Sequence, residues 1–88
     1  MIINIKYLKK KIIYRSTYRG SKEMDKLLSS FCKKYINEFD STELTHLCDL
    51  LDIDDENLYN FNQGKKITVK FKINKVTEIF KNFVYKES

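Results

Sequence analysis

The sequence predicts an all-α protein that folds as a compact bundle of about five helices in a single small domain spanning residues 1–88. The chain has 88 residues, enough for one modest hydrophobic core. It contains no Pro, the residue that breaks long helices, and its hydrophobic fraction of 42% is too high for a disordered chain. Apolar residues also recur every three or four positions in several separate stretches, which is the spacing of one helical face.

The first two helices differ in how clearly the sequence marks them. A short helix within residues 1–18 is predicted by a brief apolar stripe: Ile5, Leu8, Ile12 and Ile13. The second helix is predicted by eight apolar residues at helical spacing: Met24, Leu27, Leu28, Phe31, Cys32, Tyr35, Ile36 and Phe39. We expect Gly20 to be its N-cap, which puts Glu23 at the third helical position, where a carboxylate favours the positive end of the helix dipole.

A turn and a cap signal mark the third helix. Residues 37–41 are expected to form the turn, and Asp40 followed three residues later by Glu43 is typical of a helix start. The stripe predicted to be buried is Leu44, Leu47, Cys48 and Leu51. This helix should end near Asp52.

The fourth helix is predicted to be short. Asp54 can cap it, Leu58 and Phe61 share one of its faces, and residues 62–64 supply the stop. The acids around its start lack the glycine and terminal glutamate of a calcium-binding loop. We therefore expect them to cap the helix.

The C-terminal third gives conflicting signals. Residues 67–73 alternate with period two and are β-branched, which alone favours a strand, but the chain offers almost nothing for such a strand to pair with. We therefore expect a loop or extended arm over residues 65–71. A final helix to about Lys86 is predicted by the spacing of Val76, Ile79, Phe80, Phe83 and Val84.

The net charge of +5 is distributed unevenly. Seven of the 17 cations precede the first acid, Glu23, and the remaining ten face all 12 acids, a balance of −2. Such asymmetry steers a partner of complementary charge. Lysines interleaved with Tyr7, Tyr14 and Tyr18 also permit binding of nucleic acid through phosphate neutralisation and base stacking. A nucleic-acid-binding or antitoxin-like interaction protein is therefore the alternative, although no recognisable nucleic-acid-binding motif supports it.

The sequence offers no catalytic or metal-binding constellation. Cys32 and Cys48 have only His46 as an additional soft ligand, too few for a closed zinc site, and no CxxC is present. We expect both to be buried, reduced thiols, as in a reducing compartment. No nucleophile lies in a recognisable motif with His46, so we expect no catalytic residue and no enzyme.

Location is predicted from what the sequence lacks. No apolar run approaches the ~20 residues that cross a bilayer, so we expect no membrane insertion. The N-terminus lacks the apolar core and cleavage site of a secretory signal. We favour a bacterial cytoplasm over the mitochondrial matrix.

The sequence Arg-Gly-x-x-Glu at residues 19–23 carries the main functional signal. A residue without a Cβ lets another backbone come close, while Arg19 and Glu23 flank it as donor and acceptor. A structural interpretation also exists, because Gly20 and Glu23 suit a helix start and Arg19 can pair locally with Glu23.

Together with its surroundings, this motif resembles one family. The matching segments are residues 15–25, 39–44 and 50–61, and the resemblance spans about residues 11–64. They are similar to the succinate dehydrogenase assembly (flavinylation) factors. The ordered set of segments is specific, whereas Arg-Gly-x-x-Glu alone is not.

The resemblance implies a function. Members of that family are small five-helix proteins, similar to chaperones, that promote covalent attachment of FAD to the flavoprotein subunit of succinate dehydrogenase, and in bacteria also of fumarate reductase. It implies a protein that binds no cofactor of its own, the FAD being carried by the partner flavoprotein, and we expect it to be a monomer.

The resemblance also implies which residues bind the partner: Arg19, Gly20, Glu23, Asp25, Tyr59 and Phe61. Tyr59 and Phe61 lie where relatives have an aromatic pair that commonly ends in Trp, and Phe61 keeps the apolar bulk without the indole donor. Residues 65–75 are basic and β-branched and depart from the family pattern.

Overall fold

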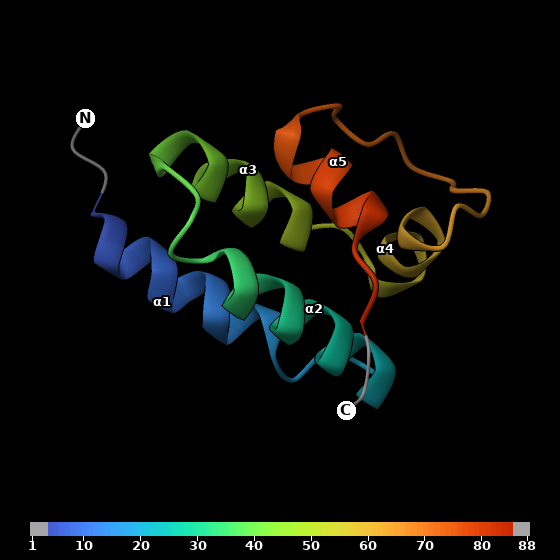
Figure 1. Ribbon diagram of the computed structural model, residues 1–88. Coiled ribbons are helices and arrows are strands. Elements are labelled where there is room, and N and C mark those ends of the chain that lie inside the picture. The colour runs from blue at the N-terminus through green and yellow to red at the C-terminus, as the bar shows by residue number, and fades with distance from the viewer. Residues whose placement is uncertain (1–3, 86–88) are drawn as a thin grey trace.

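A computed structural model describes residues 4–85 and contains five helices within that range (Figure 1). They are α1 Ile5–Ser16, α2 Lys22–Tyr35, α3 Ser41–Leu51, α4 Asp55–Asn62 and α5 Lys75–Asn82. None of the described residues forms a strand. The predicted all-α bundle is confirmed. Residues 1–3, part of the predicted N-terminal segment, lie outside the described residues, as does Lys86.

The helices pack in two layers. In Figure 1, α2 runs back along α1, while α3 and α5 lie side by side above them and α4 closes one end. The closest packed pairs are α1 with α2, α1 with α3, α3 with α5, and α4 with α5. This arrangement brings the α1–α2 connection next to the start of α4, because α1 and α3 both end there.

Each helix begins at a side chain that accepts a hydrogen bond from a backbone N–H in the first turn. These N-caps are Asn4, Ser21, Asp40, Asp54 and Asn74. The predictions at Asp40 and Asp54 are confirmed. The prediction at Gly20 is wrong, because the Ser21 hydroxyl accepts from the Met24 N–H at 3.2 Å, a bond that glycine cannot make. Glu23 is therefore the second helical residue.

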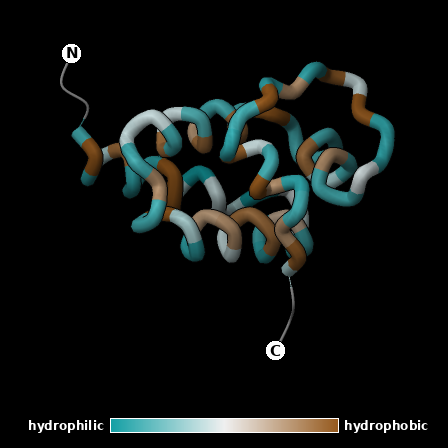
Figure 2. Tube along the Cα trace, turned by 45° about the horizontal axis from the view of Figure 1, so that its top comes forward, coloured by the Kyte–Doolittle hydropathy of each residue, from teal (hydrophilic) through white to brown (hydrophobic). Residues whose placement is uncertain are grey.

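One apolar core joins the five helices. Figure 2 shows hydrophobic and hydrophilic positions alternating along each helix, as amphipathic helices require. Phe31 lies at the centre of the core, with its ring centroid 5.1 Å from Phe80 and 5.2 Å from Phe83. Cys32 is fully buried, whereas Cys48 is only half-buried, so the expectation of two buried thiols holds for Cys32 alone.

The segment between α4 and α5 is a loop, as expected, despite its alternating sequence. Two contacts hold it inward: the Thr68 N–H donates to the Asn57 side chain at 2.8 Å, and the Phe71 ring lies 4.0 Å from Phe61. The final helix is shorter than predicted at both ends. It starts at Lys75, and the extended backbone of Phe83 ends it.

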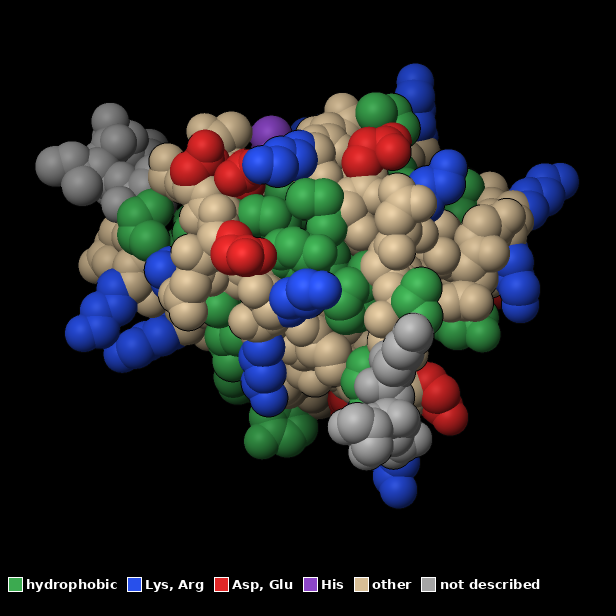
Figure 3. Space-filling model, viewed as in Figure 1, with side chains coloured by type: hydrophobic (Ala, Val, Ile, Leu, Met, Phe, Trp, Pro, Cys, Tyr) green, Lys and Arg blue, Asp and Glu red, His purple; other side chains and the backbone are tan. Residues whose placement is uncertain are grey.

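Charge on the outer surface follows the sequence asymmetry. Figure 3 shows Lys and Arg side chains projecting over α1 on one side of the molecule and over the loop before α5 on the other. Among residues 4–85, no helix is both long enough and apolar enough to cross a membrane.

Candidate partner-docking site

The connection between α1 and α2 holds the Arg-Gly motif in a fixed geometry. Tyr18 has a φ of +56°, which places this bulky residue in the left-handed region. The backbone of the next residue is anchored to α2, because the Arg19 N–H donates to the carboxylate of Asp25 in that helix. Asp25 thus fixes the backbone of the motif. We call residues 18–20 the Arg-Gly corner.

The Arg19 side chain points into the protein. Its Nε donates to Asp55 Oδ1 at 2.8 Å, forming an ion pair, and the side chain is only 14% exposed. The other guanidinium nitrogens donate to three backbone carbonyls: Arg15 in α1 at 3.0 Å, and Leu51 at the end of α3 and Ile53 just after it at 3.2 Å each. Arg19 therefore joins three segments of chain. It forms no ion pair with Glu23, so the local pair considered from the sequence is wrong.

Gly20 is exposed and is linked to the same carboxylate. Its N–H donates to Asp55 Oδ2 at 3.0 Å, so the two oxygens of Asp55 bind two consecutive residues. A Cβ at position 20 would meet only Asp55 Oδ2, at 3.4 Å, an ordinary van der Waals distance. The fold thus tolerates a side chain here. The role of Asp55 could not be read from the sequence, because an acid in a first helical turn is expected for the dipole alone.

Beside the Arg-Gly corner lies a hollow of about 490 Å³. Tyr14 and Tyr18 border it, 73% and 86% exposed, with ring centroids 6.5 Å apart. Arg15 and Asp52, which also line it, form an ion pair. The hollow offers a partner exposed aromatic rings next to a rigid backbone.

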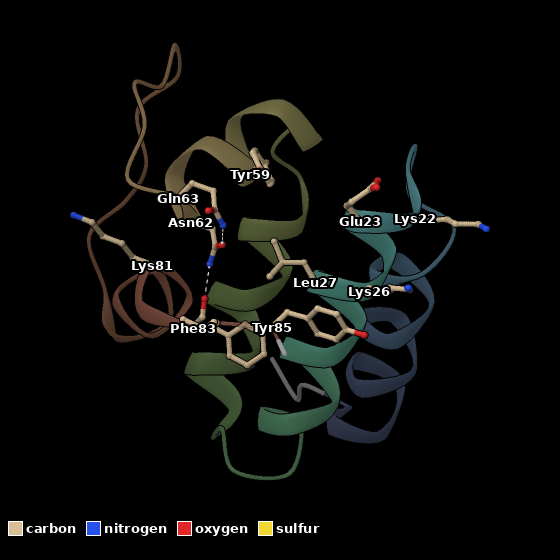
Figure 4. A pocket seen from close by; sticks show the side chains of 11 residues that line it. Lys22, Glu23, Lys26, Leu27, Tyr59, Asn62, Gln63, Lys81, Phe83 and Tyr85 are labelled. Carbon is tan, nitrogen blue, oxygen red and sulfur yellow. Dashed lines mark hydrogen bonds between the residues drawn. The ribbon is translucent and has the colours of Figure 1, made fainter. Parts of the chain in front are cut away.

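A second concave surface lies around Glu23 and Tyr59. This groove has a volume of about 610 Å³ and runs between the first turns of α2, the end of α4 and the segment after α5. In Figure 4, Glu23 and Tyr59 lie on opposite sides of it, with Leu27 between them. Phe83 and Tyr85 add further apolar surface. We call it the α2–α4 groove.

The wall of the α2–α4 groove is held by one amide. Asn62 Nδ2 donates to the carbonyls of Phe80 at 2.8 Å and Phe83 at 2.9 Å, the bond to Phe83 being visible in Figure 4. These carbonyls lie at the end of α5, where the Phe80 carbonyl also accepts from the Phe83 N–H at 3.1 Å. Asn62 thereby fixes the segment after α5 against α4.

The structure separates the six predicted binding residues into three groups. Arg19 and Gly20 belong to the Arg-Gly corner, and Asp25 binds its backbone. Glu23 and Tyr59 line the α2–α4 groove. Phe61 is 8% exposed and packs between Phe71 and Phe80 in the core. Phe61 therefore belongs mainly to the core, and its contact with a partner stays a prediction.

The described residues offer binding surfaces and no cluster of reactive groups. No three His, Cys, Asp or Glu side chains within residues 4–85 come together as a metal site would need. Burial raises the pKa of Cys32 to about 12, which keeps that thiol protonated. Together, the Arg-Gly corner and the α2–α4 groove present fixed backbone, aromatic rings and charges for contact with another molecule.

Comparison with known proteins identifies the family. The profile of the family described as "Flavinator of succinate dehydrogenase" matches residues 10–84, which include the Arg-Gly corner and most of the α2–α4 groove. The chain belongs to this family. The resemblance predicted from the Arg-Gly-x-x-Glu motif and the segments after it is thereby confirmed.

A curated relative is consistent with membership of the flavinator family. The chain is 49% identical over 49 residues to "Succinate dehydrogenase assembly factor 2, mitochondrial" of Scheffersomyces stipitis. The aligned region is 56% of this chain and 33% of that protein, so the chain matches about a third of the relative's length. No solved structure matches the chain.

Proposed function

We propose that this flavinator-family protein is an assembly factor that promotes covalent attachment of FAD to the flavoprotein subunit of succinate dehydrogenase. It acts as a chaperone by docking on that subunit, and it contributes no catalytic residue. The observation that carries the proposal is the family match over residues 10–84, within which the Arg-Gly corner is held by two carboxylates. The same docking can serve a fumarate reductase flavoprotein.

The geometry of the Arg-Gly corner supports a positioning role. Arg19, Gly20 and Asp55 are joined by hydrogen bonds, so their conformation is set before a partner arrives. A surface that is already rigid loses little conformational entropy on binding. When bound, it can hold the cofactor and the accepting residue of the flavoprotein in a reactive arrangement, and such positioning alone can lower a barrier by several kcal/mol.

In this proposal the FAD belongs to the partner. Neither the Arg-Gly corner nor the α2–α4 groove presents a glycine-rich loop that could hold a pyrophosphate: Gly20 stands alone, with its N–H already bonded to Asp55. The factor then acts as a monomer, in the compartment where the flavoprotein folds. We retain a bacterial cytoplasm as the expected location; the relative from Scheffersomyces stipitis is named as mitochondrial.

The alternative nucleic-acid function has weaker support. It rests on the lysines of α1 and on the exposed rings of Tyr7, Tyr14 and Tyr18, of which Tyr14 and Tyr18 border the hollow beside the Arg-Gly corner. Exposed lysines of this kind commonly form a solvated face. The Arg-Gly corner gives a more specific interpretation, because its hydrogen bonds build one defined shape.

Co-expression tests the proposal. The flavoprotein subunit is produced with and without this chain, and covalent flavin is read as in-gel fluorescence normalised to the amount of subunit. We expect strong fluorescence only with the factor. Equal covalent flavin in both samples would rule the proposal out. Free FAD in excess is the control that excludes a simple cofactor-delivery effect.

A further inference from the structure

Building on the proposed function, we propose that the α2–α4 groove binds an acidic segment of the flavoprotein that inserts an apolar side chain between Leu27 and Tyr59. The Arg-Gly corner then contacts the flavoprotein through a rigid backbone, and the groove recognises the negative charge and the apolar side chain of the acidic segment. Three properties of the groove favour such a segment: the positive charge around it, its apolar floor, and the hydrogen bonds that its wall amide already makes.

The charge around the α2–α4 groove is positive. Lys22 and Lys81 line it from opposite sides and project outward in Figure 4. The Lys65 ammonium lies close by, 5.3 Å from the Tyr59 ring centroid. Within residues 4–85 none of these three lysines forms an ion pair. Glu23 is the one acid among the lining residues, and it lies in the first turn of α2, where the helix dipole offsets its charge.

The floor of the groove is apolar. Leu27 lies between Glu23 and Tyr59 at the bottom of the groove, where it is 6% exposed, and the more exposed Phe83 and Tyr85 extend the apolar surface beyond it. Tyr59 is 39% exposed, so its ring is available to a partner. A groove of about 610 Å³ is within the range that accommodates a bound group of substantial size.

The polar groups of the groove wall are already used. The Asn62 amide donates to two carbonyls, and its oxygen accepts from Gln63 Nε2 at 2.7 Å. No described buried side-chain nitrogen or oxygen lacks a hydrogen-bond partner. A small free anion needs several converging donors, which this wall does not offer. An apolar floor with exposed ammonium groups around it instead fits a protein segment that carries carboxylates beside an apolar side chain.

Site-specific photo-crosslinking tests the identity of the occupant. p-Benzoylphenylalanine is placed at position 59, and the purified flavoprotein subunit is irradiated with it and analysed by peptide mass spectrometry. The control carries the same group at position 7, because Tyr7 is 64% exposed but lies on α1, away from the groove. We expect position 59 to capture one peptide with more Asp and Glu than Lys and Arg. Capture of a neutral or basic peptide, or equal capture from position 7, would overturn the inference.

Charge reversal tests the role of the lysines. The double variant Lys22→Glu with Lys81→Glu is expected to weaken binding of the flavoprotein at least ~tenfold in about 0.1 M salt, with a smaller loss at high salt. The matched control is Lys6→Glu with Lys10→Glu, which makes the same charge change on exposed positions of α1. Circular dichroism verifies that each variant is folded.

The outcomes separate the inference from the proposed function. If the wild-type chain does not bind the flavoprotein, the proposed function fails. If the wild type binds and the Lys22 and Lys81 double variant binds equally well, only the acidic-segment inference fails. The acidic-segment inference also fails if the α1 control variant loses as much affinity for the flavoprotein as the Lys22 and Lys81 double variant.

Discussion

Asp55 is shared by two consecutive residues of the Arg-Gly corner. Its oxygens accept from the Arg19 guanidinium and from the Gly20 N–H, and its side chain is 29% exposed. We predict that Asp55→Asn lowers the free energy of unfolding by about 1–2 kcal/mol, because the charged acceptor is lost while solvent screens part of the pair. Urea unfolding followed by circular dichroism measures this. An unchanged midpoint would show that the carboxylate does not hold the corner.

The two glycines should respond differently to the same substitution. Gly64 has a φ of +72°, so Gly64→Ala should cost about 1–2 kcal/mol of stability. Gly20 lies outside that region and has room for a Cβ, so Gly20→Ala should change stability by about 0.5 kcal/mol or less. Thermal unfolding of both variants measures the difference. A larger loss at Gly20 than at Gly64 would mean that glycine 20 is required by the fold.

Burial of Cys32 makes a prediction about pH. Its thiol pKa rises from 9.0 to about 12 in the folded protein, so the folded state holds this proton more tightly than the unfolded state. The resulting stabilisation is complete below pH 9 and is lost as the pH rises towards 12. At pH 8 iodoacetamide should leave Cys32 unmodified until urea is added, while half-buried Cys48 reacts faster. Rapid alkylation of Cys32 without urea would contradict its burial.

At the scale of the helix, local patterns were informative where the interactions are local. Apolar spacing predicted α2, α3 and α4, because each helix buries one face. The caps at Asp40 and Asp54 are bonds over three residues, so they too can be read from the sequence. At α2 the predicted cap, Gly20, has no side-chain acceptor, and the hydroxyl of the next residue, Ser21, accepts the first-turn bond instead.

Interactions between distant residues were not predictable in this way. Arg19 meets Asp55 across 36 positions, and Asn62 meets the end of α5 across 18 to 21. Such pairs depend on how the helices pack, which spacing along one helix does not encode. The same limit hid the burial of Phe61, whose core neighbour Phe71 comes from a loop that resembled a strand. The end of α5 was misjudged because Phe83 and Val84 continue its helical spacing.

The contact between α4 and α5 is expected to stabilise the last helix. Asn62→Ala removes the donor to the Phe80 and Phe83 carbonyls, which leaves part-buried acceptors without that partner. We predict a loss of about 1–3 kcal/mol in the free energy of unfolding. Urea titration measures it, with Asn60→Ala on the same helix as the control. If both variants unfold at the same urea concentration, Asn62 does not hold α5.

For the molecule as a whole, the helices bring two surfaces to one end of the bundle. The α1–α2 connection meets the start of α4 at the Arg-Gly corner, and α2 meets the end of α4 at the α2–α4 groove. The proposed docking function follows from membership of the flavinator family. Because different residues form the two surfaces, substitutions can test each surface separately. The corner is rigid because its charges are paired, while Lys22, Lys65 and Lys81 at the groove form no ion pair within residues 4–85.

The central claim is that the Arg-Gly corner docks on the flavoprotein. It is tested most directly by the affinity of the purified flavoprotein subunit for wild-type protein and for Gly20→Arg, whose fold should persist because position 20 has space. Thr45→Arg adds the same side chain at an exposed position of α3 and serves as the control. We predict that Gly20→Arg weakens binding at least about thirtyfold while Thr45→Arg binds like the wild type. Wild-type affinity for a folded Gly20→Arg variant would contradict the account.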